Sequence, residues 1–287
     1  MFDRRLAARA LAVALAALAF AACNQMRPAF FSRGAASRED RNRQFLSPIQ
    51  PIGERNLGLP QIREKLQSRT ANVKSLRANL DLVAGAGRLR QQFAANLFVQ
   101  PSGFLRVRGS QNQGTVFDIL VRDEAVQFVI FPDRSFYQGT LGELRANPQI
   151  LAGIYPEQLI ENFTVEQTLL RRMKQFPDAM LYQDRQHYII RFELGNGVSE
   201  RYHLRETDLL VDLYERYDSE QRTSSMRFWA YQIFDGKYLL PSQFVVESAR
   251  SGGRFSATVT EMRVNEAMPS ALAQLDIPPN FTRMNPR

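Results

Sequence analysis

Cys23 is the residue of this sequence whose type and position point most directly to chemistry. It is the only cysteine among 287 residues. A single cysteine excludes an internal disulfide framework and any zinc or iron–sulfur site with several cysteine ligands. Cys23 directly follows Ala21 and Ala22, at the end of residues 10–22, a stretch with no polar side chain. The chemistry of this thiol therefore depends on what the preceding stretch does.

The first 22 residues have the composition of a secretory signal. Arg4, Arg5 and Arg9 form a basic start, an apolar stretch follows, and small residues precede the cleavage point. The apolar stretch is shorter than the ~20 residues that a transmembrane helix needs. The small pair before Cys23 resembles the bacterial lipobox, although Phe20 stands where that motif usually has leucine. The resemblance implies cleavage before Cys23, a thioether-linked diacylglycerol on its sulfur, and an acyl chain such as palmitate on the new N-terminus.

Two alternatives to the lipobox reading stay open: an ordinary cleaved signal with an incidental cysteine, and an uncleaved membrane anchor. The lipoprotein reading is favoured because the only cysteine falls where acylation needs it. Several acyl chains anchor a protein stably, whereas one chain binds a membrane only marginally. Asn24, rather than an aspartate, follows the cysteine and resembles an outer-membrane sorting signal. The expected location is the periplasmic face of the outer membrane, with the membrane as a partner through the lipid anchor.

The net charge of +8 comes from 37 Lys and Arg against 29 Asp and Glu, and it is unevenly placed. Residues 1–22 contribute +2 and residues 23–56 contribute +3, which leaves +3 for the remaining 231 residues. A domain that binds nucleic acid usually carries a strongly basic face. No nucleic acid is therefore expected as a partner. The basic charge of residues 23–56 instead favours anionic lipid headgroups.

Enzyme motifs are missing from the sequence. It has no G-x-S-x-G, no Walker loop and no H-E-x-x-H. Gly85 and Gly87 lack the third glycine of a dinucleotide fingerprint, and we expect them in a turn. His187 and His203 flank a predicted hairpin and could lie close together, but zinc sites need three or more ligands. We expect exposed histidines, no catalytic residues, no metal and no cofactor beyond the lipid on Cys23, with a dispersed active site as a minor alternative.

The patterning of apolar residues divides the chain into three parts. Residues 1–22 form the signal peptide, and residues 23–56, rich in Arg, Ser, Pro, Gly and Asn, form a flexible tether. Residues 57–287 begin with a helical pattern after Pro60, change to alternation of period two near residue 76, and return to it after a helical insert at about 141–177. We predict an α+β, mostly antiparallel domain: a curved half-barrel sheet of about 10–12 strands wrapped around a few helices.

Short motifs in this domain resemble a known bacterial family. They are VKSLRA (73–78), GRL (87–89), PSGFLRV (101–107), DILVRD (118–123), LP (240–241) and IP (277–278). Together they resemble the Lol fold, shared by a periplasmic lipoprotein carrier and its outer-membrane receptor. Glu124 departs from the glycine that the family has in one hairpin. The resemblance implies an apolar cavity that accepts acyl chains, with the helical insert as its lid and no catalytic residues.

Nine apolar residues are candidates for lining that cavity. They are Leu97, Val107, Phe117, Ile119, Phe128 and Ile130 on predicted strands, Leu151 and Ile154 in the insert, and Trp229. Each is a core residue in any packing and lines a cavity only if the helices leave the space open. For Trp229, apolar neighbours on both sides favour the centre of the core over a cavity wall. We thus expect a membrane-anchored periplasmic lipoprotein that binds an acyl chain, a lipid or a lipoprotein in outer-membrane transport. The alternative is a non-enzymatic structural or partner-binding lipoprotein of an envelope assembly.

Overall fold

The computed structural model describes residues 50–51, 57–86, 89–112, 114–147, 156–249 and 252–284. The predicted signal peptide, Cys23 and nearly all of the predicted tether lie outside these residues. The same holds for two of the cavity candidates, Leu151 and Ile154. Within the ranges given, no helix combines the length and the apolar character needed to span a bilayer.

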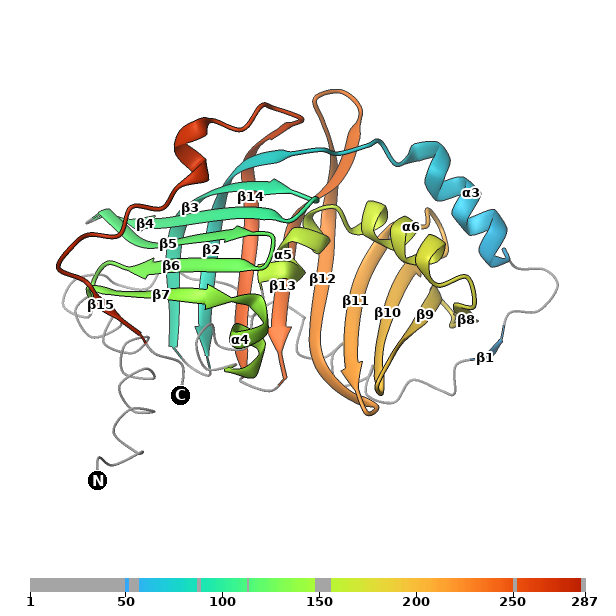
Figure 1. The fold of residues 1–287 in the computed structure, drawn as a ribbon. Helices are drawn as coiled ribbons and strands as arrows, with labels where there is room; N and C mark the ends of the chain where they lie inside the picture. The colour runs from blue at the N-terminus through green and yellow to red at the C-terminus, as the bar shows by residue number, and fades with distance from the viewer. Residues whose placement is uncertain are drawn as a thin grey trace.

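One large, curved sheet organises the described residues (Figure 1). Its strands are β1 (Gln50–Pro51), β2 (Leu76–Ala86), β3 (Leu89–Gln100), β4 (Phe104–Gln111), β5 (Gly114–Arg122), β6 (Ala125–Ile130), β7 (Ser135–Thr140), β8 (Met180–Gln183), β9 (His187–Gly195), β10 (Val198–Arg205), β11 (Val211–Asp218), β12 (Gln221–Phe234), β13 (Tyr238–Ser248), β14 (Gly253–Val264) and β15 (Thr282–Arg283). The order across the sheet is β1-β8-β9-β10-β11-β12-β13-β14-β2-β3-β4-β5-β6-β7-β15. The predicted single, curved, mostly antiparallel sheet is confirmed.

The sheet of 15 strands is larger than the 10–12 expected. Three strands are very short: β1 and β15 have two residues each, and β8 has four. Segments of this length show no alternation of apolar and polar residues, so the pattern cannot reveal them. Strands β1 and β15 pair with β8 and β7 and cover the two edges of the sheet, which would otherwise offer unpaired backbone groups.

The helices of the described residues are few and lie on one face of the sheet (Figure 1). They are α3 (Leu59–Arg69), α4 (Leu141–Ala146), α5 (Pro156–Phe163) and α6 (Val165–Gln175), and a 3₁₀ turn, η1 (Ser270–Ala273), lies near the C-terminal end. Helix α3 has a proline in its first turn, where the missing N–H costs nothing. Its buried residues Ile62 and Leu66 are four apart and so face the sheet together.

Two apolar clusters form on opposite faces of the sheet. The larger one lies between the helices and the sheet and includes Leu66 of α3, Leu169 of α6 and inward-facing strand residues such as Leu105. The smaller one lies on the other face, where Phe98, Phe104 and Leu120 of β3, β4 and β5 pack against the segment that follows β14. Strand neighbours such as Leu97 and Phe98 point to opposite faces, so both clusters use the same strands.

Candidate functional site

The helix-covered face of the sheet holds the site, and an apolar cleft opens there between α3 and the C-terminal end of α6. The cleft has a volume of about 130 Å³. Its lining consists of Leu59, Pro60 and Arg63 from α3 and of Met173, Phe176, Pro177 and Ala179 from α6 and the residues after it. Only Arg63 among these carries a charge. The volume is below the roughly 300–1,000 Å³ of typical small-ligand pockets, so a long acyl chain fits only if α3 moves away from α6.

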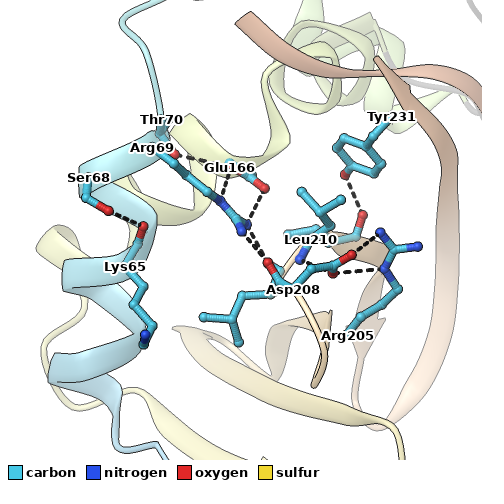
Figure 2. Close-up of polar contacts among 11 residues, drawn as sticks. Lys65, Ser68, Arg69, Thr70, Glu166, Arg205, Asp208, Leu210 and Tyr231 are labelled. Atoms are coloured by element: carbon cyan, nitrogen blue, oxygen red, sulfur yellow. Dashed lines mark hydrogen bonds and ion pairs between the residues drawn. The ribbon is translucent and has the colours of Figure 1, made fainter. Parts of the chain in front are cut away.

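Arg69, the last residue of α3, connects this helix to α6 and to the sheet (Figure 2). Its guanidinium Nη2 donates to Glu166 Oε1 over 2.6 Å, and Nε donates to Oε2 over 3.3 Å. The same guanidinium donates to two main-chain carbonyls in the turn between β10 and β11, those of Asp208 and Leu209 (2.8 Å for Leu209). Thr70 adds a hydrogen bond of 3.2 Å to Glu166. One side chain thus joins the end of α3 to two other elements.

Glu166 is a buried carboxyl group in the first turn of α6. Burial raises its pKa above the ordinary value, and the charge and hydrogen bonds of Arg69 and Thr70 oppose this only in part. A pocket of about 20 Å³, the size of one water molecule, adjoins it. Thr164 lines this pocket and its hydroxyl, although buried, has no hydrogen-bond partner among the described residues. Thr164 and Glu166 are therefore buried together, with room for about one water molecule beside them.

A second polar cluster fixes α6 to strands β10 and β11. The carboxylate of Glu200 on β10 is fully buried. It accepts hydrogen bonds from Arg172 of α6 (3.0 Å), from Arg216 (2.9 Å) and from the hydroxyl of Tyr214 (3.0 Å). Arg172 also contacts Glu161 of α5, whose pKa is raised by burial. Helix α6 is consequently attached to the sheet through its middle, whereas α3 is attached through Arg69 at its end.

Six of the nine cavity candidates lie on the helix-covered face. Leu97, Val107 and Phe128 are buried in the large apolar cluster, and Phe117, Ile119 and Ile130 are half-buried against it. Their placement in a ligand cavity stays a prediction. The cleft and the two polar clusters use other residues, which the sequence patterns did not single out. Glu200 was detectable, because it shares the inward parity of Tyr202 and Leu204 on β10, where an acidic residue is unexpected.

The prediction that Trp229 packs in the centre of the core is wrong, because its side chain is 39% exposed. It follows Phe228, which faces the helices, and so points to the opposite face of β12. Its indole nitrogen donates to the side chain of Gln243 on β13. Apolar residues on both sides of this strand therefore do not indicate burial on both faces.

The two histidines are close together, as the hairpin predicted, and their rings lie 6.1 Å apart. The expectation that they are exposed is wrong, since both are buried. His187 lies 2.8 Å from a carboxylate oxygen of Asp212, and His203 lies 3.1 Å from one of Glu215. Among the described residues, no group of three or more His, Cys, Asp or Glu is arranged to hold a metal ion. The pairs account for the burial of these polar rings.

Comparisons with known proteins give no relative by sequence but several by structure. No protein-family model and no curated protein match the sequence. A domain described as an outer membrane lipoprotein-sorting protein from Vibrio parahaemolyticus aligns with a TM-score of 0.52, at 10% identity, over 73% of this chain and 93% of that one. A LolA superfamily protein from Nitrosomonas europaea aligns with 0.51, at 13% identity, over 76% and 98%.

The chain has a Lol-type fold. A DUF1329 family protein from Desulfovibrio piger shares it, with a TM-score of 0.54 and 10% identity over 74% of this chain and 94% of that one. The alignments cover nearly the whole of each similar structure and 73–76% of this chain, so the likeness extends well beyond a single motif. At identities of 10–13% the likeness shows the fold alone and carries no information about particular residues.

Proposed function

We propose that this chain is a lipid-anchored envelope lipoprotein that binds an acyl chain, of a lipid or of an acylated lipoprotein, between its helices and its sheet. In this proposal the sheet forms a half-barrel around the helices, Cys23 carries the anchor at the periplasmic face of the outer membrane, and the bound lipid is in transit. The observation that carries the proposal is the apolar cleft between α3 and α6, which continues the large apolar cluster. The Lol-type fold supports it, since similar structures are described as lipoprotein-sorting or LolA superfamily proteins.

Binding in this cleft requires no catalytic group. Each buried CH₂ stabilises a complex by ~0.8 kcal/mol, so burial of about ten methylenes contributes roughly 8 kcal/mol toward the free-energy cost of association. The cleft of about 130 Å³ receives the first part of a chain, and separation of α3 from α6 extends the space along the apolar cluster. Helix α6 stays in place through Arg172 and Glu200, so we expect α3 to be the part that moves. The lid is then α3 rather than the insert at 141–177.

Native mass spectrometry of the mild-detergent extract tests the proposal. A non-covalent acyl ligand appears as added mass that is lost under denaturing conditions, whereas the covalent lipid on Cys23 remains. Ala179→Trp fills the cleft, and we expect it to abolish the added mass. Met180→Trp, at the exposed neighbouring position, is the matched control and keeps it. Protein that is empty in repeated preparations, and that does not take up a fluorescent fatty acid, would favour the alternative of a partner-binding envelope lipoprotein.

The anchor is tested separately. Metabolic labelling with radioactive palmitate is expected to mark the wild-type chain and to miss a Cys23→Ala variant. Fractionation of the labelled cells on a density gradient then assigns the chain to the inner or the outer membrane. An unlabelled wild-type chain would contradict the anchor and leave the acyl-binding cleft untouched.

A further inference from the structure

Arg63 is the only charged residue that lines the apolar cleft between α3 and α6. It follows Leu59 by four positions, so the two side chains lie on the same face of α3. Arg63 is exposed, whereas Met173, on the α6 side of the cleft, is only 6% exposed. The cleft therefore has its mouth beside Arg63 and an enclosed wall at Met173.

The guanidinium of Arg63 has no ion pair and no hydrogen bond within the part of the chain that the structure describes. In contrast, the other arginines of the same two helices each contact a glutamate; they are Arg69, Arg171 and Arg172. An arginine that is already paired gains little from a further anion, because its charge is compensated. Arg63 thus offers an uncompensated guanidinium at the mouth of an apolar cleft.

The other charged residues near the cleft do not line it. Glu64 follows Arg63 on α3 and is exposed, and consecutive helix residues point in different directions. Asp178 stands between two lining residues, but it is exposed and forms no ion pair with Arg63. Lys174 of α6 is exposed and adds a positive charge next to Met173 in the sequence. An anion from outside therefore meets Arg63 without displacing a partner among the described residues.

The cleft leads from Arg63 toward the large apolar cluster. Leu59 and Phe176, which line the cleft from its two sides, both pack against that cluster. The ring of Phe176 lies beside that of Phe192 on β9, with centroids 6.2 Å apart. Phe192 is fully buried. An acyl chain whose head stays at Arg63 thus points its tail toward β9, where its methylenes meet apolar side chains.

We infer that the cleft selects acyl ligands with an anionic head, a carboxylate or a phosphate, which Arg63 binds at the mouth. This inference rests on the acyl-binding function proposed above and narrows it. A guanidinium forms charge-assisted, often bidentate, hydrogen bonds with a carboxylate or a phosphate, and these are stronger than bonds between neutral groups. The acylated N-terminal cysteine of a lipoprotein has esters, a thioether and an amide beside its chains, and none of these is charged. Arg63 therefore favours an acidic lipid over a lipoprotein as the ligand.

Three ligands with the same alkyl chain and different heads test the inference: decanoate, decyl phosphate and decanol. In isothermal titration calorimetry with the full-length mature chain at neutral pH, both anionic ligands should bind about fivefold more tightly than decanol. Arg63→Met should reduce their affinities to that of decanol and leave decanol binding unchanged, whereas Arg63→Lys should keep part of the preference. Lys65→Met removes an exposed charge of the same helix outside the cleft, and this control should keep the full preference. Partition into detergent is the same for every variant, so the comparison between variants is decisive.

Two results would overturn the inference. If Arg63→Met weakens decanol as much as decanoate, or weakens neither, Arg63 does not recognise a charge. If a synthetic triacylated cysteine peptide loses as much affinity as decanoate in this variant, the arginine does not distinguish an acidic lipid from a lipoprotein. The acyl-binding function stands in both cases, because the ligands still bind; failure of every ligand to bind wild-type protein would contradict that function, and this inference with it. Where a ligand copurifies, the mass released under denaturing conditions assigns the anionic head to a fatty acid or to a phospholipid.

Discussion

Two arginines, one on each face of the sheet, attach a segment of chain to the strands beneath it. On the helix-covered face, Arg69 joins α3 to Glu166 and to the carbonyls of Asp208 and Leu209. On the opposite face, Arg106 pairs with Asp118 and holds the C-terminal segment, residues 266–284, through the carbonyls of Ala271 and Gln274. The chemistry is the same: a carboxylate fixes the guanidinium, and the guanidinium holds main-chain oxygens.

The two arginines differ in burial. The side chain of Arg69 is 26% exposed, whereas that of Arg106 is 6% exposed. Asp118 also binds Arg108 at 2.6 Å, so it faces two positive charges, while Glu166 faces one and has a raised pKa. Loss of a partner from a fully buried pair costs more, because an unpaired charge stays in a medium of low polarisability. The Arg69 contact is thus the easier of the two to open, as the proposed movement of α3 requires, whereas Arg106 holds residues 266–284 more firmly.

Replacement of Arg106, the more buried of the two arginines, gives the largest expected effect. Arg106→Met leaves Asp118 buried with only the half-exposed Arg108 as a partner. We expect a loss of about 3–4 kcal/mol in the free energy of unfolding, measured by urea denaturation. The control Arg108→Met removes an arginine that is 49% exposed and should cost at most about 1 kcal/mol. Equal costs would show that the burial of Arg106 is unimportant.

Acid titration compares the carboxyl groups of the two faces. Burial by itself raises the pKa of Glu215, on the outer face, but hydrogen bonds and charges from His203 and Arg222 outweigh it and lower the pKa to about 2. The folded state therefore gains stability from ionised Glu215 above the unfolded value of 4.5, and this gain is lost as the pH falls from there toward 2. The penalty of Glu215→Gln should thus shrink by about 2 kcal/mol between pH 5 and pH 3.

Glu166, on the helix face, titrates with the opposite sign. Its pKa is raised in the folded state, so the folded chain binds a proton more readily, and stability contributed by this group increases as the pH falls through the raised pKa. Glu166→Gln is therefore the matched control for Glu215→Gln in the same urea series. If both variants respond to pH in the same direction, the electrostatic contrast between the two faces is absent.

The third-largest effect is expected when α3, the proposed lid, loses its attachment through Arg69. Arg69→Met removes the contacts of α3 with Glu166 and with the turn after β10, and the carboxyl group can become protonated in response. We expect a cost of about 1–2 kcal/mol in the free energy of unfolding and faster hydrogen exchange in α3. Arg63→Met, at the cleft on the same helix, should leave exchange at the end of α3 unchanged. Unaltered exchange in Arg69→Met would mean that α3 is held by its apolar contacts alone.

The sequence predicts much of the sheet and little of these contacts. Alternation of period two identifies strands such as β2, where Leu76, Ala78, Leu80 and Leu82 are all buried. It does not say what covers each face, which is why Trp229 was misplaced. The Arg69 cluster joins residues 97 and 140 positions apart, from three elements. No local spacing encodes such a contact, since it arises only when the curved sheet brings the turn after β10 to the end of α3.

The smallest expected effect comes from relieving backbone strain in β12. The strained residue lies where the buried part of this strand ends. Ala230 has a φ of +51°, in the left-handed region that favours glycine. Before it, Met226 and Phe228 are buried; after it, Ile233 is 66% exposed. Ala230→Gly relieves the steric cost of the left-handed conformation, ~1–2 kcal/mol, and loses part of this through chain entropy, so we expect a gain of about 0.5–1 kcal/mol. Ala94→Gly, at an exposed position of β3, should instead cost about 0.5–1 kcal/mol. A loss of stability in both variants would mean that the methyl group of Ala230 contributes more to stability than its backbone strain costs.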